Sequence, residues 1–559
     1  MPVSALLTSN MSRSELGSDS PNGKSDSFQG SSLRSIRYFI TLALMAGSLY
    51  SCGGGAPKFS NPGPLSTVKS ASNGSTSSSA SSSSAASSTA VSVSTAAQSS
   101  STTASVGTFV APPALSVTGS GTAELAMYQS DRSPYSFSQF RAVESNNTGN
   151  NGYDDATLDP NSLRVIDLGP FYQGYPTVAV DLSASPAAIS FAWPSDRGYS
   201  NLICDLPGSG SYNLDALCIR SLLQEIDSMA NSDSYILSPS QGRTFGQLTS
   251  DIDPQANSTV NQQQLNEAID LYLDVANSIA NVRVVSPSES QFQYSVTIDS
   301  LDNLASTLNA VKSVYPSRAM VRIVVDPGVS LTQYQSAIDL AHSMSIKVMI
   351  ELMDSQYMKN YSFSNYQARI DQILGTLKDV DAWEIGNEVN GNWLGSNVAE
   401  KVAYAIDKAS GTSTAPLFLT LYWQLGEDDA AHSIFNWVSE NLNAGEISKL
   451  SSVGISLYPQ EAPLGASFYR IMTTLHTVYF PSQSVYIGEL GYGGSGVSGS
   501  WWWGSPAVTD ASKAQTASTY VGLLLALPYP ISAGPFWWYF VEEYQSSPQL
   551  LASLHSWYR

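Results

Sequence analysis

From residue 291 to residue 559 the chain alternates regularly between strand-like and helix-like segments. Eight short apolar runs recur in this part of the chain, and amphipathic stretches such as TQYQSAIDLAHSM and NYQARIDQILGTL lie between them. Eight β/α units over this length are typical of a closed parallel barrel. The predicted strands are YSVTID, AMVRIVVD, IKVMIEL, DAWEIGN, PLFLTLYW, SVGISLY, SVYIGEL and SAGPFWWYF.

A doubly wound open sheet is the competing α/β architecture. Such a sheet carries a glycine-rich phosphate loop after an early strand, and no G-x-G-x-x-G motif stands at that place. We therefore predict an α/β fold with a (β/α)8 TIM barrel over residues 291–559.

Residues 110–290 show a different pattern. Short β-branched and aromatic runs separated by turn residues extend to about residue 205, and two helical stretches follow, LDALCIRSLLQEIDSMA and VNQQQLNEAIDLYLDVANSIA. We expect a small accessory region that is first β-rich and then helical. A carbohydrate-binding domain and a packing domain are both open interpretations of it.

The N-terminus has the sequence pattern of a targeting signal. Arg34 and Arg37 precede the apolar run YFITLALMAGSLYS, which ends directly before Cys52. This run is too short to cross a bilayer as an ordinary helix, but it has the length of a signal-peptide core. The sequence L-Y-S-C at its end resembles the lipobox of bacterial lipoproteins, which implies lipidation of Cys52. We predict a lipoprotein signal peptide with an N-terminal extension over residues 1–51; an ordinary secretory signal is the alternative.

Residues 52–109 are dominated by Ser, Ala and Thr. Such a segment cannot bury enough apolar area to offset its chain entropy, so we predict a flexible tether. The lipid at Cys52 would be the only contact with a membrane. The expected location is the bacterial cell envelope, at the outer membrane or the cell surface, or otherwise the secreted fraction.

The other two cysteines form a candidate pair. Cys204 and Cys218 flank the turn-rich sequence DLPGSGSYN, and in an exported protein this pair predicts a disulfide. Two free buried thiols are the alternative. Because the sequence has no C-x-x-C motif and no His/Cys cluster, we expect no structural metal and no cofactor.

The charge balance argues against two classes of partner. The 559 residues have a formal charge of −20, and the first 109 contain six basic and three acidic residues, which leaves 20 basic and 43 acidic residues, net −23, in the remainder. Such a surface repels phosphate backbones and anionic lipid headgroups, so we expect no nucleic-acid partner. Few charges with many Tyr, Trp, Asn and Ser suit a secreted protein that handles neutral polar ligands. We expect a carbohydrate substrate and a monomer.

Active groups of a parallel barrel lie at the C-terminal ends of its strands. None of the four histidines is predicted there, and neither G-x-S-x-G nor H-E-x-x-H occurs, which disfavours imidazole-based nucleophilic catalysis and a His-ligated metal. Carboxylates and aromatics dominate these positions instead: Asp299, Asp326, Asp354, Asn387, Glu388, Tyr422, Trp423, Tyr458, Glu489, Trp537 and Trp538.

Paired carboxylates with aromatic walls suit the cleavage of glycosidic bonds. The segments DAWEIGNEVNG and VYIGELGYG resemble the two signature strands of clan A glycoside hydrolases, the retaining (β/α)8 enzymes that include cellulases, mannanases and galactanases. The resemblance covers residues 291–559, close to half of the chain. It implies that Glu388 is the acid/base, that Glu489 is the nucleophile, and that Asn387 binds the 2-hydroxyl of the sugar.

Further substrate-binding residues follow from the same resemblance. Arg322 in MVRIVV is similar to the second-strand arginine of the clan, which holds the nucleophile and keeps it ionised, and Glu384 is a candidate for its buried partner. Tyr458 in ISLYPQ is similar to the sixth-strand tyrosine that also holds the nucleophile. The expected sugar platform is drawn from Trp538, Trp537, Trp393 and Trp502, the last within the run Trp501, Trp502 and Trp503.

The chain also departs from the best-known members. Where many of them have a histidine after the third strand, this chain has Leu352, Met353 and Asp354, and the sequence VVDPG lacks the Pro and Trp that follow the arginine in cellulase-like families. We therefore do not expect a close relative of the cellulases. The main hypothesis is a retaining glycosidase acting on a β-linked polysaccharide or oligosaccharide. A non-catalytic glycan-binding lipoprotein and a transglycosylase are the alternatives.

Overall fold

The computed structural model describes residues 110–145, 155–252, 260–284, 292–426, 429–460, 462–492 and 508–558. These ranges all belong to one compact unit. The predictions for the signal peptide, the tether, Cys52, and the tryptophans at 501–503 lie outside the described residues.

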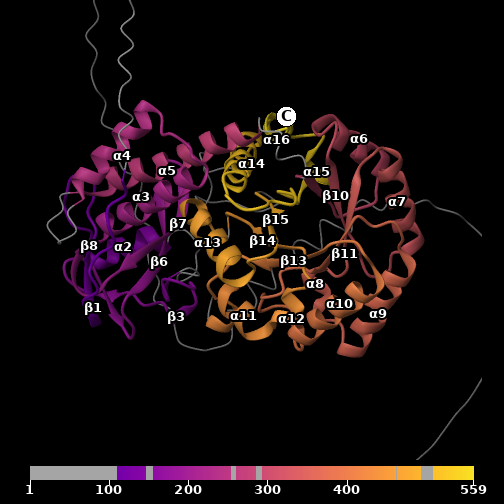
Figure 1. Ribbon diagram of the computed structural model, residues 1–559, viewed down its shortest axis with the longest axis horizontal. Helices are drawn as coiled ribbons and strands as arrows, with labels where there is room; N and C mark the ends of the chain where they lie inside the picture. Colours follow the sequence, from indigo (N-terminus) through magenta and orange to yellow (C-terminus); the bar gives the residue numbers. More distant parts are fainter. Residues whose placement is uncertain are drawn as a thin grey trace, which may run out of the picture. The chain divides into compact units, whose positions relative to one another are not determined.

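Seven parallel strands form the central sheet, and each pairs with its neighbour in the sequence (Figure 1). Almost every position in them is buried, because helices cover one face and the barrel interior covers the other. Apolar β-branched runs without polar alternation are what such strands require. Their bounds are β9 (Tyr294–Ile298), β10 (Ala319–Val324), β11 (Lys347–Glu351), β12 (Ala382–Gly386), β13 (Leu417–Tyr422), β14 (Ser452–Leu457) and β15 (Ser484–Leu490).

An eighth segment joins the two edges of this sheet. Ile531 and Trp537 bridge to β15, Trp537 also bridges to β9, and Ala533 bridges to Gln293 just before β9, all in parallel orientation. The result is a TIM-like barrel. The continuous strand predicted for SAGPFWWYF is wrong in extent, because Pro535 has no N–H to donate and Gly534 has a φ of +107°, so only isolated bridges form.

Helices connect the strands and lie outside the sheet (Figure 1). Side chains that accept a hydrogen bond from the first turn start several of them, including Ser330, Ser362 and Thr509. The helices are α6 (Leu304–Val314), α7 (Leu331–Ser343), α8 (Ser355–Met358), α9 (Phe363–Thr376), α10 (Val398–Thr412), η2 (Ala430–His432), α11 (Ile434–Asn441), α12 (Ala444–Ile447), η3 (Gly465–Ser467), α13 (Phe468–Thr474), η4 (Leu475–Tyr479), α14 (Asp510–Leu525), α15 (Phe540–Glu543) and α16 (Pro548–Ser556).

The described elements before β9 comprise two four-stranded sheets and four helices. The strand orders are β4-β5-β1-β8 and β3-β2-β6-β7, and all neighbours are antiparallel except β1 and β8. The bounds are β1 (Gly119–Ala126), α2 (Phe137–Ser145), β2 (Ala156–Leu158), β3 (Val165–Leu168), β4 (Tyr172–Gln173), β5 (Val178–Leu182), β6 (Ala187–Ser195), β7 (Gly198–Leu206), β8 (Gly208–Asn213), α3 (Leu214–Ser232), α4 (Pro239–Asp251) and α5 (Gln262–Val284).

An aromatic cluster fills the core of these sheets. Phe140 stacks on Trp193 with ring centroids 5.5 Å apart, and Tyr135 meets Trp193 edge to face at the same distance. Phe171 and Phe191 complete the cluster. These rings bury large apolar areas in favourable offset or edge-on geometry, which explains the aromatic runs between turn residues in the sequence.

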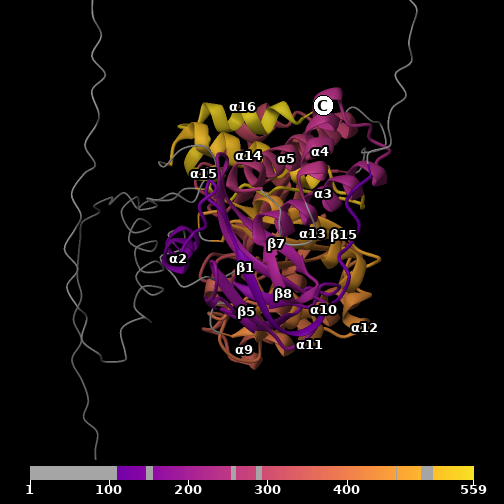
Figure 2. The same cartoon turned by 90° about the vertical axis from the view of Figure 1, so that its left-hand side faces the viewer.

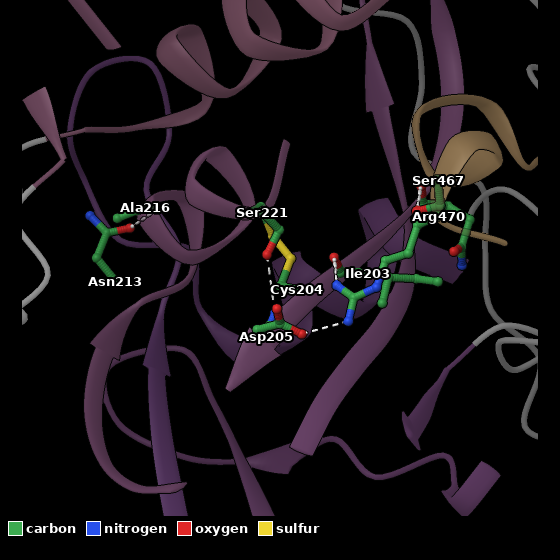
Figure 3. Close-up of a disulfide and its surroundings, with 10 residues drawn as sticks. Ile203, Cys204, Asp205, Asn213, Ala216, Ser221, Ser467 and Arg470 are labelled. Atoms are coloured by element: carbon green, nitrogen blue, oxygen red, sulfur yellow. Dashed lines mark hydrogen bonds and ion pairs between the residues drawn. A yellow bond between two sulfur atoms is a disulfide. The ribbon is translucent and has the colours of Figure 1, made fainter. Parts of the chain in front are cut away.

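The predicted disulfide is confirmed. Cys204 in β7 is bonded to Cys218 in α3, and strand β8 lies within the loop that the bond closes (Figure 3). The side chain of Asn213 caps α3 by accepting from the backbone N–H of Ala216. Beside the bridge, the backbone N–H of Asp205 donates to Ser221, so the bond is embedded in a polar network that ties β7 to α3.

The N-terminal elements pack on the outer helices of the barrel (Figure 2). Asn436 in α11 exchanges two hydrogen bonds with the backbone of Val165, and Arg470 in α13 forms an ion pair with Asp205 at 2.6 Å. These contacts join the barrel wall to β3 and β7. Within the described ranges, the helices are all too short or too polar to cross a membrane.

Candidate active site

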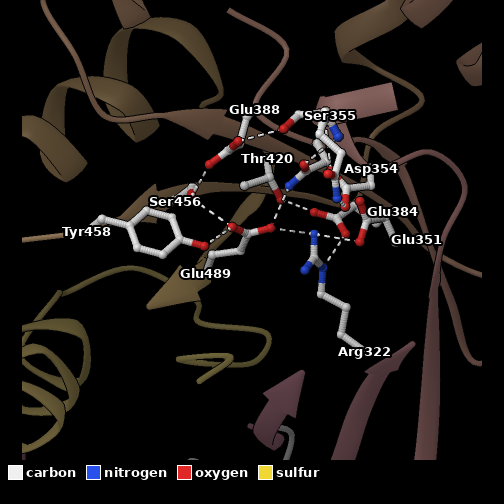
Figure 4. Close-up of polar contacts among 12 residues, drawn as sticks. Arg322, Glu351, Asp354, Ser355, Glu384, Glu388, Thr420, Ser456, Tyr458 and Glu489 are labelled. Atoms are coloured by element: carbon white, nitrogen blue, oxygen red, sulfur yellow. Dashed lines mark hydrogen bonds and ion pairs between the residues drawn. The ribbon is translucent and has the colours of Figure 1, made fainter. Parts of the chain in front are cut away.

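Five strands bring polar side chains together at the C-terminal end of the barrel (Figure 4). Parallel strands all end on the same side, so residues far apart in the sequence meet there. Glu388 follows β12 and Glu489 lies near the end of β15. Arg322 comes from β10 and Glu351 from β11, while Ser456 is on β14.

Glu388 occupies a strained backbone conformation directly after β12. Its φ is +49°, a region that non-glycine residues rarely adopt and that is often found at functional sites. Its carboxyl group accepts a hydrogen bond from Ser355 at 2.7 Å and another from Ser456 at 2.7 Å. Burial raises the pKa of Glu388 well above its usual range, and the nearby charge of Glu489 raises it further. Burial and the charge of Glu489 therefore both favour the protonated form of Glu388.

Glu489 accepts hydrogen bonds on both oxygens. Oε1 lies 2.8 Å from Nη2 of Arg322 and 2.8 Å from Nδ2 of Asn387, while Oε2 accepts from the hydroxyl of Tyr458 at 2.6 Å. The residue is only 3% exposed. This set of donors fixes the direction of the carboxylate and satisfies it in a site with little water.

An irregularity in the pairing of β14 with β15 sets the direction of the Glu489 side chain. In the pairing of β14 with β15, Ile455 lies opposite Ile487 and Ser456 lies opposite Glu489, so Gly488 has no partner. An extra residue of this kind bends the strand and redirects the following side chain. A Cβ at Gly488 would lie 2.5 Å from the hydroxyl oxygen of Thr420, which explains the glycine in the sequence VYIGEL.

Ser456 stands between the two carboxyl groups (Figure 4). Its hydroxyl oxygen is 2.7 Å from Oε1 of Glu388 and 3.2 Å from Oε2 of Glu489, so the separation of these two oxygens cannot exceed the sum of the two distances. The hydroxyl has a single hydrogen, and it can donate to only one carboxyl group at a time. The two carboxyl groups are thus close, coupled and separated by one small side chain.

Arg322 is the centre of a fully buried ionic cluster. Nε contacts Glu384, and Nη2 lies 3.0 Å from Glu351 and 2.8 Å from Glu489. Glu384 also accepts from Thr420, whose hydroxyl is 2.7 Å from that of Tyr486. A single positive charge inside an apolar strand needs buried carboxylates around it, and β11, β12 and β15 supply them.

The predicted aromatic residues lie in different surroundings. Trp538 is half-buried, with the guanidinium of Arg322 5.5 Å from its ring centre. Trp393 is also half-buried; it meets Tyr422 edge to face and donates to Ser355 at 3.3 Å. Trp537, by contrast, is fully buried and its indole N–H donates to Glu543, so its ring is part of the core and offers no face to a sugar.

Asp354 and Trp423 are two further residues that the sequence predicts at strand ends. Asp354 caps α8 and bonds Gln356, and burial raises its pKa to about 6. Trp423 is buried in the core. The four histidines bond to groups outside the site, and within the described ranges no cluster of His, Cys, Asp or Glu is arranged to hold a metal ion.

Three residues of the site were not anticipated from the sequence. Glu351 carried a signal, because it is a lone charge at the end of the apolar run IKVMIEL, as Arg322 is in its own strand. Ser355 and Ser456 carried none, since serine is common in every part of this chain. Only the folded structure shows that both of them contact Glu388.

Comparisons with known proteins give weak similarities. No protein-family model and no curated protein matches the chain. A structure of a GH113 β-1,4-mannanase shares 12% identity at a TM-score of 0.35, over 48% of this chain and 97% of that one. GH5_18 from Streptomyces cattleya, in complex with GlcNAc, shares 13% identity at a TM-score of 0.33, over 47% of this chain and 80% of that one. A psychrophilic glycoside hydrolase family 10 endo-β-1,4-xylanase shares 15% identity at a TM-score of 0.33, over 44% of this chain and 87% of that one. Similarity at this level assigns no activity.

The ionic cluster around Arg322 should contribute to the stability of the folded protein. Replacing Arg322 by Met leaves Glu384 and Glu489 buried without their cation, and we expect the free energy of unfolding at neutral pH to fall by about 3–5 kcal/mol. Burial already raises the pKa of Glu384, and removing the cation raises it further. The protonated forms tolerate burial, so the deficit should shrink on acidification and grow as the pH rises. Denaturant unfolding of both proteins across pH measures this; a deficit independent of pH would contradict it.

Proposed function

We propose that the chain is a retaining glycoside hydrolase that cleaves a β-linked polysaccharide or oligosaccharide by double displacement. The observation that carries the proposal is the closeness of Glu388 and Glu489, whose oxygens are bridged by the Ser456 hydroxyl at 2.7 and 3.2 Å. Retaining enzymes place their two carboxyl groups about 5–5.5 Å apart, whereas inverting enzymes leave about 6.5–9.5 Å for a water molecule. Two groups that share one hydroxyl are too close for the inverting arrangement.

Different surroundings give the two carboxyl groups different roles. Glu388 has a raised pKa and donates its proton to the leaving oxygen, while Glu489, held by Arg322 and Tyr458, attacks the anomeric carbon. The bond from the anomeric carbon to the leaving oxygen breaks as the bond to Glu489 forms. In the second step Glu388 takes a proton from water, the water oxygen attacks the anomeric carbon, and Glu489 is released as a carboxylate.

Asn387 and the half-buried aromatics are the proposed sugar contacts. The side-chain carbonyl of Asn387 accepts from the backbone N–H of Ser355 at 3.0 Å, which orients its amide N–H toward the nucleophile and the adjoining 2-hydroxyl. Trp538 lies beside Arg322, and Trp393 lies beside Ser355 on the acid/base side. Flat rings on both sides of the carboxyl pair suit the C–H faces of pyranose units.

Nucleophile and acid/base variants test the proposal directly. On the glycan or aryl glycoside identified from a panel of β-linked substrates, E489A should lose all hydrolysis. The activity of E388A should fall by about 10²–10⁴-fold on a substrate with a poor leaving group and by much less on a substrate with a good one. Azide should rescue E388A with retained configuration at the anomeric carbon and E489A with inverted configuration, as NMR of the product shows. E267Q, at an exposed site on α5, is the control.

Three results would contradict these assignments. Absence of turnover on every substrate of the panel would favour a glycan-binding protein. An inverted product from the unmodified protein would exclude the assigned roles. Activity that survives in E489A would place the nucleophile elsewhere. Transglycosylation would be seen as larger products when an acceptor sugar is added, and it leaves the two-glutamate chemistry unchanged.

The pH dependence of kcat/KM for the proposed hydrolysis should depend on the two serines that bind Glu388. The hydroxyl of Ser355 stabilises the charged form of Glu388 and so lowers its pKa relative to burial alone. Removing it in S355A should raise this pKa and shift the basic limb of kcat/KM to higher pH, because the acid form persists longer. The control is S452A, since Ser452 lies at the opposite end of β14 and bonds Ser484. A basic limb that stays in place or moves to lower pH would contradict the role of Ser355.

We also propose that the enzyme acts at the cell envelope through a lipid on Cys52. This proposal depends on the L-Y-S-C motif and on the Ser-rich segment that follows it. A labelled fatty acid should be incorporated into the full chain and not into C52S, and labelling of C52S to the same extent would refute it.

A further inference from the structure

The cluster around Arg322 contains more carboxyl groups than one cation can balance. Glu351 and Glu384 are fully buried, and Glu489 is 3% exposed. Three ionised carboxylates with one guanidinium would leave two uncompensated negative charges in a medium of low dielectric constant, where each costs several kcal/mol. Buried groups in this position take up a proton instead. At least one of the three must therefore be neutral in the folded protein.

The hydrogen-bond partners differ sharply among the three. Glu489 accepts hydrogen bonds from Asn387, Tyr458 and Ser456 and forms an ion pair with Arg322, and Glu384 accepts from Nε of Arg322 and from the hydroxyl of Thr420. Glu351 has only a 3.0 Å contact to Nη2 of Arg322, the nitrogen that also serves Glu489. Within the described part of the chain, neither of its oxygens meets a hydrogen-bond donor in good geometry.

The charges that face Glu351 act in the same direction. Burial is the largest influence and raises its pKa well above the usual range, and the charges of Glu384, Asp354 and Glu489 raise it further. Arg322 on β10 is the opposing group, and its positive charge is divided among three carboxyl groups. The surroundings therefore favour the neutral form of Glu351 over that of its better-bonded neighbours.

We propose that Glu351 is a neutral carboxylic acid in the resting protein and acts as a positioning residue for Arg322. An ionised Glu351 would compete with Glu489 for Nη2. A neutral Glu351 fills the space beside the guanidinium and leaves its charge to Glu384 and Glu489. The connection to the nucleophile depends on the proposed function; the protonation state of Glu351 does not.

Infrared spectroscopy tests the protonation state without any substrate. A protonated carboxylic acid has a carbonyl stretch well separated from that of a carboxylate. The difference spectrum between unmodified protein and E351Q at neutral pH should show the loss of one such acid band. E388Q should lose a different acid band, because burial raises the pKa of Glu388 as well, and the two losses should add in the double variant. E267Q, which removes an exposed carboxyl group, should leave the acid bands unchanged.

Stability provides the second measurement. E351Q exchanges one neutral group for another of nearly the same shape, so it should fold and keep its melting temperature close to that of the unmodified protein. E384Q removes a charge that is bonded to Arg322 and should melt at a much lower temperature. Loss of a carboxylate band in place of an acid band in E351Q would overturn the proposal. So would an E351Q protein that fails to fold while E267Q folds.

The proposal about Glu351 and the proposed function can be tested independently of each other. If the protein hydrolyses no glycan, the infrared and melting results still decide the state of Glu351. If turnover is found, the pH profile of kcat/KM gives a further test: E351Q should keep the profile of the unmodified protein at neutral pH and below, because the replaced group is neutral there. A shift of the acid limb in E351Q, but not in E267Q, would show that Glu351 is charged in the working enzyme.

Discussion

The buried guanidinium of Arg322 is the interaction on which the site depends. It contacts carboxyl groups from β11, β12 and β15 and approaches the ring of Trp538, so one side chain ties together strands that are far apart in the sequence. A charge can remain at 0% exposure only if groups of opposite charge lie close to it. Closure of the barrel, burial of the cluster and orientation of Glu489 therefore all depend on the same ionic contacts.

The backbone contributes as much as the side chains to this arrangement. The register break at Gly488 turns Glu489 toward the pair, and a second break between Glu384 and Gly386 occurs on β12, just before Glu388. Irregularities of this kind cost ladder hydrogen bonds, and they occur where a side chain must be redirected. With the positive φ of Glu388, they place backbone strain at the two strands that supply the proposed catalytic carboxyl groups.

Much of the fold could be predicted from the sequence, because apolar runs at regular intervals reflect burial on both faces of a parallel sheet. The eighth segment was predicted less well, since Gly534 and Pro535 interrupt the hydrogen-bond ladder without changing the apolar pattern. In the site, Arg322 and Glu489 stand out as charges in apolar strands. Ser456 could not be found in this way: a serine has functional meaning here only through its distances to two carboxyl groups, and those distances are a property of the closed barrel.

The closeness of the two carboxyl groups has a consequence for the proposed reaction. The charge of Glu489 is one cause of the raised pKa of Glu388, so Glu388 keeps its proton as long as the nucleophile is free. Formation of the covalent intermediate converts that charge into an ester and removes the repulsion. The pKa of Glu388 then falls, and its carboxylate form suits the role of base toward water. The single hydroxyl of Ser456 can follow the charge, since it lies within reach of both groups.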